Sequence, residues 1–318
     1  MKVVVTFPIP DVAKQMISRH ALLECWESEE SLPIPTLIDW VADADAILTT
    51  LTCPIGSEVL VHAPRLKIIS TVSVGVDHID VVAAAERGVI VGHTPGVLTD
   101  STADLTLALM LGLARRVSEG DAFIRSGAWS EGWKPNLMLG TDLCAATVGL
   151  IGLGPIGQAV VTRLKGFGCR ILASSRTTRS VEDVEFIDRD TLLCTADIVS
   201  LHTALTPETA GMIGRKELAL MKDGAMLINT ARGALVDEAA LVAEVKSGRL
   251  RAGLDVYAEE PLPLSSELLK LRGCVLLPHV GSATERTRRA MFELALANLF
   301  AGLQGRDPPA RLSVKALA

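Results

Sequence analysis

Short apolar runs rich in β-branched residues alternate with helical patterns along the chain. In the first hundred residues these runs are "KVVVTF", "AILTTL", "LKIISTVS" and "GVIVGHT", separated by helical patterns such as that of residues 36–44. Strands that alternate with helices predict βα units and a parallel sheet.

A second series of strand patterns begins at "ATVGLIGLG" and continues through "RILASS", "DIVSLHT", "AMLINTA", "AGLDVY" and "CVLLPH". Six strand candidates in succession suffice for a complete doubly wound nucleotide-binding sheet. After them, "ERTRRAMFELALANLFAGLQG" predicts a long amphipathic helix that returns to the first block. We therefore expect an α/β protein with two doubly wound parallel-sheet domains, the first assembled from both ends of the chain.

Two segments between these blocks have more than one interpretation. "TADLTLALMLGLARR", residues 102–116, is apolar around nearly its whole circumference, so a helix there must be covered on every side. It either lies buried between domains or packs partly against another subunit. The Gly-rich stretch 115–140 carries Trp129 and Trp133, which either anchor this loop or project into a site or an interface.

Composition narrows the classes of function. The 318 residues are 49% hydrophobic and 21% charged, with a formal net charge of −6, which disfavours a nucleic-acid binder. No apolar stretch reaches the ~20 residues of a membrane span, and "MKVVVTFPIP" lacks the features of a secretory signal, so we expect a cytoplasmic protein. Six scattered cysteines without a CxxC pair favour reduced thiols over disulfides or a metal site.

The strongest local motif is GxGxxG in "VGLIGLGPIGQAVVTRLKGFG". Gly152, Gly154 and Gly157 follow the strand pattern 147–151 and precede the helical pattern 156–167. In this setting the first glycine makes a tight turn, the second lets the backbone approach a pyrophosphate, and the third lets the helix pack closely on the strand. The helix N-terminus then faces the phosphates, so the motif predicts a dinucleotide.

The end of the next strand indicates which dinucleotide. An NAD site places an acidic residue there to bind the ribose hydroxyls, but this chain has Ser175 followed by Arg176, Thr177 and Arg179. A guanidinium matches the charge and geometry of a 2'-phosphate, and hydroxyls donate to its other oxygens. We therefore expect NADP(H), the alternative being that Arg176 is only a solvated turn residue.

Polar residues follow several predicted strands, where open α/β sheets bind their ligands. Taken singly, Arg232 could cap a helix, Glu260 could be a surface charge and His279 a satisfied loop histidine. Together they suit the reduction of a 2-oxo acid, because a carboxylate prefers a bidentate Arg and a carbonyl oxygen needs a proton donor such as His paired with an acid.

These segments are also where the chain resembles the D-isomer-specific 2-hydroxyacid dehydrogenases. "VGLIGLGPIG", "LINTARGALVDE", "AGLDVYAEEP" and "LLPHVGSAT" look like the family's signature segments in the right order, and the match covers almost the whole length. Within the family, "STVSVGVDHID", "TPGVLTDSTADLTLALML", "GWKP" and the "SSRT" turn look most like the glyoxylate/hydroxypyruvate reductases, which use NADPH.

The resemblance implies a discontinuous flavodoxin-like substrate domain, 1–100 and 285–318, and an inserted Rossmann dinucleotide-binding domain, 101–284. It places the active site in the cleft between them and implies a homodimer built around the domain-linking helices. The catalytic residues it implies are Arg232, which binds the substrate carboxylate and carbonyl, His279, the general acid, and Glu260, its partner.

Further positions carry roles implied by the resemblance alone. The N–H groups of Val74 and Gly75 hold the substrate carboxylate, Ser282 lines the pocket, and Trp133 reaches the partner subunit's site. Asp255 lies beside the nicotinamide carboxamide. Other positions that match cofactor contacts are Thr102, Pro155, Ile156, Thr203, Thr230, Ala231, Arg232, His279 and Gly281.

The expected reaction is NADPH-dependent reduction of glyoxylate or hydroxypyruvate to the D-2-hydroxy acid. Two alternatives remain at this point. One is a reductase of a bulkier 2-oxo acid, an aromatic pyruvate or a 2-ketogluconate-type sugar acid. The other is a dinucleotide-sensing protein like the transcriptional corepressors of similar fold, against which stand the complete Arg/Glu/His set and the lack of long basic or disordered extensions.

Overall fold

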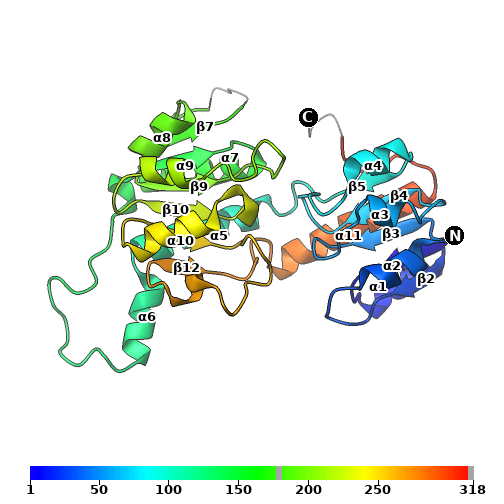
Figure 1. Ribbon diagram of the computed structural model, residues 1–318, viewed down its shortest axis with the longest axis horizontal. Helices are drawn as coiled ribbons and strands as arrows, with labels where there is room; N and C mark the ends of the chain where they lie inside the picture. Colours follow the sequence, from blue (N-terminus) through cyan, green and yellow to red (C-terminus); the bar gives the residue numbers. More distant parts are fainter. Residues whose placement is uncertain (177–180, 314–318) are drawn as a thin grey trace. The chain divides into compact units, whose positions relative to one another are not determined.

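The chain forms two compact units, shown in Figure 1. The computed structural model describes residues 1–176 and 181–313. Unit 1 comprises Met1–Leu98 and Thr284–Ala318, and unit 2 comprises Thr99–Ala283.

The strands of unit 1 form one parallel sheet. In its described residues, five strands have the order β2-β1-β3-β4-β5, the flavodoxin-like order. They are β1 (Lys2–Val5), β2 (Leu22–Cys25), β3 (Ala46–Thr49), β4 (Ile68–Thr71) and β5 (Ile90–Gly92). Because β1, β3 and β4 are covered on both faces, they are buried along almost their whole length.

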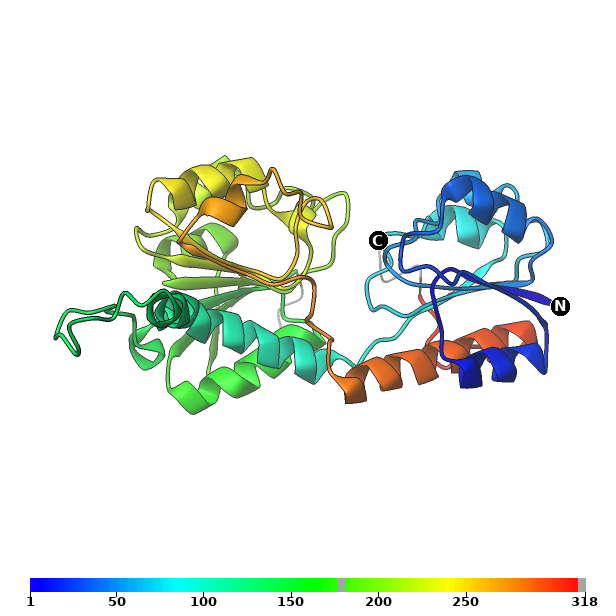
Figure 2. The same cartoon turned by 90° about the horizontal axis from the view of Figure 1, so that it is seen from below.

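The helices of unit 1 cover both faces of this sheet, as Figure 2 shows. One face carries α1 (Asp11–Ser18) and α11 (Glu285–Leu303). The other face carries α2 (Ile34–Val41), α3 (Ser57–Leu60) and α4 (Val81–Glu86). Helix α11 contacts β3, β4 and β5, so the sheet of the first hundred residues is completed by a helix from near the other end of the chain.

Unit 2 contains a larger parallel sheet. In its described residues, seven strands have the order β12-β11-β10-β9-β6-β7-β8, which is a Rossmann arrangement extended by one strand. They are β6 (Thr147–Ile151), β7 (Arg170–Ser174), β8 (Val184–Phe186), β9 (Ile198–Leu201), β10 (Met226–Asn229), β11 (Arg251–Leu254) and β12 (Cys274–Leu276).

The helices of unit 2 lie on two faces. Helices α5 (Thr99–Ala114) and α7 (Pro155–Leu164) cover one face, and α8 (Arg189–Thr195), α9 (Arg215–Leu220) and α10 (Glu238–Lys246) cover the other (Figure 2). Short 3₁₀ turns are η1 (Leu143–Ala145), η2 (Lys165–Phe167), η3 (Gly233–Leu235) and η4 (Glu267–Lys270). The expected fold class, two doubly wound parallel sheets, is confirmed.

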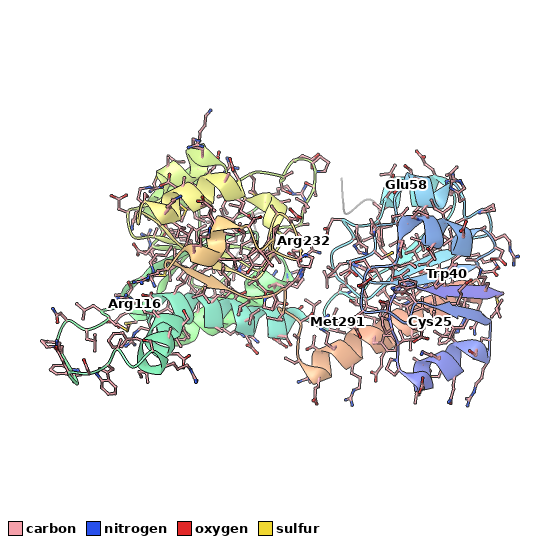
Figure 3. All side chains as sticks on the ribbon, turned by 60° about the horizontal axis from the view of Figure 1, so that its bottom comes forward. Cys25, Trp40, Glu58, Arg116, Arg232 and Met291 are labelled. Atoms are coloured by element: carbon pink, nitrogen blue, oxygen red, sulfur yellow. The ribbon has the colours of Figure 1, made fainter. Side chains whose placement is uncertain are left out.

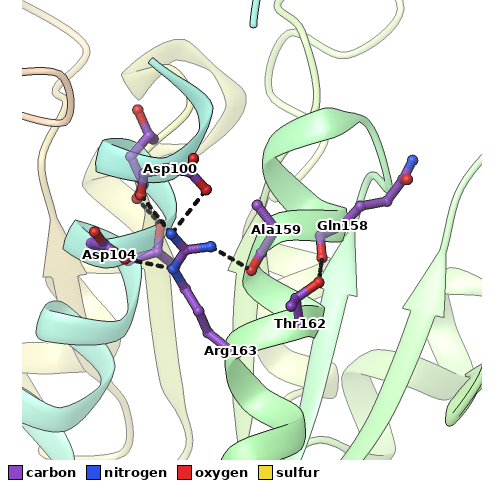
Figure 4. Close-up of polar contacts among 8 residues, drawn as sticks. Asp100, Asp104, Gln158, Ala159, Thr162 and Arg163 are labelled. Atoms are coloured by element: carbon purple, nitrogen blue, oxygen red, sulfur yellow. Dashed lines mark hydrogen bonds and ion pairs between the residues drawn. The ribbon is translucent and has the colours of Figure 1, made fainter. Parts of the chain in front are cut away.

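An ion-pair cluster joins α5 to α7, as Figure 4 shows. The Arg163 guanidinium donates to Asp104 Oδ1 at 2.5 Å and to Asp100 Oδ1 at 3.0 Å, and its third nitrogen donates to the Ala159 carbonyl. Helix α5 therefore packs against the helix that starts at the glycine motif.

The sequence prediction missed three elements of the fold. The predicted strands omitted the edge strands β2 and β8, because both are short and largely polar or half-exposed. The stretch 115–140 was treated as a loop, but it contains α6 (Val117–Arg125). Helix α6 and the loop that follows project away from the sheet of unit 2 (Figures 1 and 2).

None of the helices in the described residues is long and apolar enough to cross a membrane. The six cysteines all lie within the described residues, and all are free thiols.

Candidate active site

The glycine motif forms a turn between β6 and α7 that suits a dinucleotide pyrophosphate. Gly152 has φ +95°, and a Cβ there would lie 2.5 Å from the His202 carbonyl oxygen. A Cβ on Gly157 would lie 2.6 Å from the Gly152 carbonyl oxygen. Gly154 has nothing within 4 Å of its Cβ position, so the backbone is open where phosphates would approach the start of α7.

His202 closes the other side of this turn. Its backbone N–H donates to the Ile151 carbonyl at 2.8 Å, and its ring Nε2 contacts Ser200 Oγ at 2.9 Å. Burial lowers the pKa of His202 to about 4, so the ring is neutral at physiological pH. This residue adds no charge and acts as a packing support for the glycine turn.

The residues predicted to bind the adenosine ribose follow β7. Strand β7 ends at Ser174, Ser175 is partly buried and Arg176 is exposed. A hydrogen bond from Thr206 and, more weakly, the charge of Arg176 lower the pKa of Glu208, which places that carboxylate in the same region. The predicted contacts of Thr177, like Arg179, lie outside the described residues.

Glu260 and His279 form a close ionisable pair. Glu260 Oε2 lies 2.6 Å from His279 Nδ1, and Glu260 Oε1 accepts the Tyr257 N–H at 3.0 Å. Burial alone would raise the pKa of Glu260, but hydrogen bonds from His279 and Tyr257 outweigh it, so the pKa lies below its ordinary value. The carboxylate is therefore ionised and fixes the imidazole through Nδ1, leaving Nε2 for a substrate.

Asp255 fixes the backbone turn that carries His279. Its two carboxylate oxygens accept the N–H groups of Val280 and Gly281, each at 2.8 Å. His279 has φ +53°, a left-handed conformation that a residue with a side chain adopts only when its surroundings impose it. Burial raises the pKa of Asp255, against the effect of the two N–H groups. The described contacts of Asp255 are thus to this turn.

Arg232, which is labelled in Figure 3, follows β10 on a turn. The buried Asn229 side chain donates to the Arg232 carbonyl at 2.8 Å and accepts the Ala231 N–H at 3.0 Å. The Arg232 charge contributes to lowering the pKa of Glu260. The structure thus brings Arg232, Glu260 and His279 together at the carboxyl ends of β10, β11 and β12.

The remaining predicted residues fall into two groups. Val74 and Gly75 belong to unit 1, in the loop after β4. Unit 2 holds the rest: Thr102 donates to the Gly281 carbonyl at 3.3 Å, and Thr230 contacts Thr106 at 2.9 Å. Pro155 and Ile156 begin α7, Thr203 follows β9, Ala231 precedes Arg232, Ser282 is partly buried, and the Trp133 side chain on the projecting loop is 80% exposed.

Sequence reasoning missed the residues that hold the site. Asn229 and His202 were not singled out, although both lie at the end of a predicted strand beside a predicted ligand residue. Tyr257 was also missed: burial raises its pKa to about 12, so its hydroxyl stays protonated and donates to the Leu277 carbonyl at 2.9 Å. The sequence feature that could have identified these three residues is a polar or aromatic side chain at the end of an otherwise apolar strand.

A Rossmann sheet with an open glycine turn, next to an Arg, a His and its acidic partner, defines a nicotinamide dinucleotide-dependent oxidoreductase. The sequence model of the "D-isomer specific 2-hydroxyacid dehydrogenase, NAD binding domain" matches residues 107–281. The chain belongs to the D-isomer specific 2-hydroxyacid dehydrogenase family.

Individual relatives agree with this assignment over the full length. The chain is 47% identical to the glyoxylate reductase of Thermococcus litoralis, covering 97% of this chain and 95% of that protein. The crystal structure of the TT0316 protein from Thermus thermophilus has a TM-score of 0.91 and 47% identity, covering 98% of this chain and all of that one. An NADPH-dependent glyoxylate/hydroxypyruvate reductase from Sinorhizobium meliloti, in complex with NADP and malonate, has a TM-score of 0.89 and 30% identity, covering 98% and 96% of the two chains.

Proposed function

We propose that this enzyme reduces glyoxylate or hydroxypyruvate to the D-2-hydroxy acid with NADPH. The observation that carries the proposal is the 2.6 Å contact between Glu260 and His279, within the electrostatic reach of Arg232. A proton donor held by a carboxylate beside a guanidinium suits a substrate with a carbonyl next to a carboxylate.

Each residue then has a defined role. A dinucleotide held at the turn of Gly152, Gly154 and Gly157 would supply the hydride that reduces C2 of the oxo acid. Arg232 binds the carboxylate and polarises the carbonyl, and His279 donates a proton to the carbonyl oxygen. Glu260 stabilises the protonated ring, and the N–H groups of Val74 and Gly75 bind the carboxylate. Asn229 and Asp255 keep the turns of Arg232 and His279 in place.

Turnover with a panel of 2-oxo acids tests the substrate class. We expect kcat/KM for glyoxylate and hydroxypyruvate to exceed that for phenylpyruvate and 2-ketogluconate. A higher kcat/KM for either bulky acid would contradict the small-substrate proposal, and a complete lack of turnover with all four would contradict the reaction itself.

The preference for NADPH is proposed from Ser175 and Arg176, which follow β7 where an NAD enzyme carries an acid. The relative from Sinorhizobium meliloti that binds NADP gives the proposal further support. In Arg176→Ala we expect the ratio of kcat/KM with NADPH to that with NADH to fall about 10- to 100-fold, because a charge-assisted bond to phosphate is lost.

Arg170→Ala is the matched control for this experiment. Arg170 is an exposed arginine at the opposite end of β7, paired with Glu185 at 2.6 Å. The coenzyme ratio should stay at the wild-type value in Arg170→Ala. A wild-type ratio near or below one would contradict the preference for NADPH.

We also propose a homodimer, built on the projecting segment of unit 2. Exposed apolar side chains gather there: Val117, Ile124, Trp133 and Leu139 are 60%, 60%, 80% and 67% exposed. Several exposed apolar side chains on one projecting segment are typical of an interface. Light scattering should give twice the 33.7 kDa chain mass, and Ile124→Glu should shift it toward the monomer. A wild-type monomer would contradict the dimer.

A further inference from the structure

The loop that follows β4 in unit 1 holds its backbone in an unusual way. The Ser73 carbonyl accepts the Thr94 N–H at 2.8 Å, and the Val74 carbonyl lies 3.1 Å from His93 Nδ1. The Gly75 carbonyl accepts the Ser73 hydroxyl at 2.7 Å. Three consecutive carbonyls are thus each bonded within unit 1.

The orientation of these carbonyls sets the direction of the amides. In a planar trans peptide, the C=O of one residue and the N–H of the next point in opposite directions. A fixed Ser73 carbonyl therefore directs the Val74 N–H away from Thr94, and a fixed Val74 carbonyl directs the Gly75 N–H away from His93. Among residues 1–176 and 181–313, neither N–H has a hydrogen-bond acceptor. Adjacent amides of this kind form an anion-binding concavity.

His93 is itself fixed from the opposite side. Its N–H donates to the Ala310 carbonyl at 3.1 Å, and its carbonyl accepts the amide of Asn298, a buried residue of α11, at 2.9 Å. Because a carbonyl oxygen can only accept, the His93 ring carries a proton on Nδ1 and donates it to Val74. The ring is therefore a positioned donor to this loop.

Ser73 is held by a directed chain of hydrogen bonds. Its single hydroxyl proton goes to the Gly75 carbonyl, so the 2.8 Å contact with Thr71 requires Thr71 to donate to Ser73. Thr71 then accepts from His78 Nε2 at 3.0 Å. Thr71 and Ser73 are both buried, so the chain is sheltered from competing water.

We propose that His93 and Ser73 are positioning residues, which hold the Val74 and Gly75 amides in the orientation that binds the carboxylate of the oxo acid. This inference rests on the proposed function, because that function supplies the carboxylate. Without the hydrogen bonds from His93 and Ser73, the loop populates orientations in which the Val74 and Gly75 amides do not face the substrate. A competent fraction reduced to about a tenth raises the apparent dissociation constant about tenfold, with no change in the chemistry of the bound complex.

The matched pair His93→Asn and His93→Asp tests the role of His93. Asn Nδ2 is as many bonds from Cα as His Nδ1, so His93→Asn can still donate to the Val74 carbonyl. His93→Asp is nearly the same size but turns an acceptor toward that carbonyl. We expect His93→Asp to raise KM for glyoxylate about tenfold while kcat and KM for NADPH change less than about threefold, and His93→Asn to rescue KM to within about threefold of wild type.

Equal KM values in the two variants, or a loss that falls on kcat or on KM for NADPH, would overturn the role of His93. If His93→Asp lacks the circular dichroism spectrum of the wild type, Ser73→Ala decides. It removes only the hydroxyl that holds Gly75, and we expect a KM for glyoxylate raised about fivefold at constant kcat. An unchanged KM in Ser73→Ala would then overturn the inference.

Calorimetric titration of oxamate, a non-reducible oxo-acid analogue, into the NADPH-loaded proteins separates this inference from the proposed function. If the wild type reduces no 2-oxo acid but oxamate binds about tenfold more weakly to His93→Asp than to His93→Asn, the reaction is wrong and the positioning role stands. If glyoxylate is reduced and oxamate binds the two variants equally, only the positioning role is wrong. A wild type that fails to bind oxamate overturns the inference.

Discussion

The strand ends of unit 2 carry ionisable side chains, whereas those of unit 1 carry hydroxyl groups. In unit 2, Arg232, Glu260 and His279 follow β10, β11 and β12. In unit 1, the buried Thr6 and Thr49 hydroxyls contact each other at 2.9 Å, and Thr71 and Ser73 lie at the end of β4. Both sheets are parallel and these residues follow the carboxyl ends of their strands, so the difference lies in the side chains and not in the architecture.

The ionisable residues of unit 2 and the hydroxyl residues of unit 1 suit different tasks. Proton transfer and binding of a reacting carbonyl need charge that can be supplied or stabilised, and burying such charge is tolerable only when it is paired. Orienting a backbone needs no charge, and buried hydroxyls do it with little desolvation cost. We therefore expect substitutions in unit 2 to change kcat and its pH dependence, and substitutions in unit 1 to change KM alone.

Removing the proton donor should have the largest effect. In His279→Ala we expect kcat to fall about 10²- to 10⁴-fold, the usual contribution of a positioned general acid. Dinucleotide affinity, measured by fluorescence titration, should change little because the glycine turn is intact. An unchanged kcat would reject the catalytic role of His279.

Changing the shape of the cation at Arg232 should come next. Arg232→Lys keeps the charge but loses the planar pair of donors, so we expect kcat/KM for glyoxylate to fall about 10- to 100-fold. Arg232→Gln removes the charge as well and should fall further. Steady-state kinetics of the two variants distinguish the effect of the guanidinium's planar geometry from the effect of its charge. Equal activity of Arg232→Lys and wild type would contradict bidentate binding of the substrate carboxylate.

Neutralising Glu260 should mainly change the pH dependence. In Glu260→Gln the imidazole loses the carboxylate that fixes it, so we expect the pH profile of kcat/KM to differ from that of the wild type. Because the pKa of Glu260 is lowered by folding, its stabilising contribution is complete above the ordinary value of 4.5 and is lost as the pH falls through the folded pKa. The difference in Tm between wild type and Glu260→Gln should therefore shrink below about pH 4.5. Superimposable pH profiles would contradict the pairing.

The smallest effect on kinetics is expected for the hydroxyl residues at the end of β4 in unit 1. Thr71→Val keeps the shape of Thr71 but breaks its contacts with Ser73 and His78. One net hydrogen bond is worth about 1 kcal/mol, so we expect KM for glyoxylate to rise at most about fivefold while kcat stays constant. A change in kcat larger than the change in KM would contradict the expectation that substitutions in unit 1 change KM alone.

The sequence predicted both sheets because their central strands are buried on two faces and are therefore continuous apolar runs. It did not predict β2 or β8, because an edge strand has a solvated side and a mixed pattern. Helix α6 was missed because it lies in a Gly-rich, partly polar stretch and none of its residues is buried.

The sequence could nominate candidate site residues where chemistry requires a particular side chain. Arg232, Glu260 and His279 were nominated because few residues can bind a carboxylate or donate a proton at neutral pH, and the structure brings the three together. Asn229, Ser73 and His93 were not predicted, because their side chains hydrogen-bond to the backbone of neighbouring residues. Such contacts depend on turns that one sequence does not reveal. The buried contacts of Asp255 with Val280 and Gly281 are of the same kind.

The pairing of residues 310–312 with β5 bears on the order of events during synthesis. Gly92 bridges Arg311, and the Leu312 N–H donates to the Val91 carbonyl at 2.7 Å. Unit 1 therefore stays unfinished on the ribosome while all of unit 2 is made, for roughly 10–40 s at ~5–20 residues per second. During that time the sheet face later covered by α11 is exposed on the nascent chain, so slow translation of the segment that precedes α11 would favour aggregation of this half.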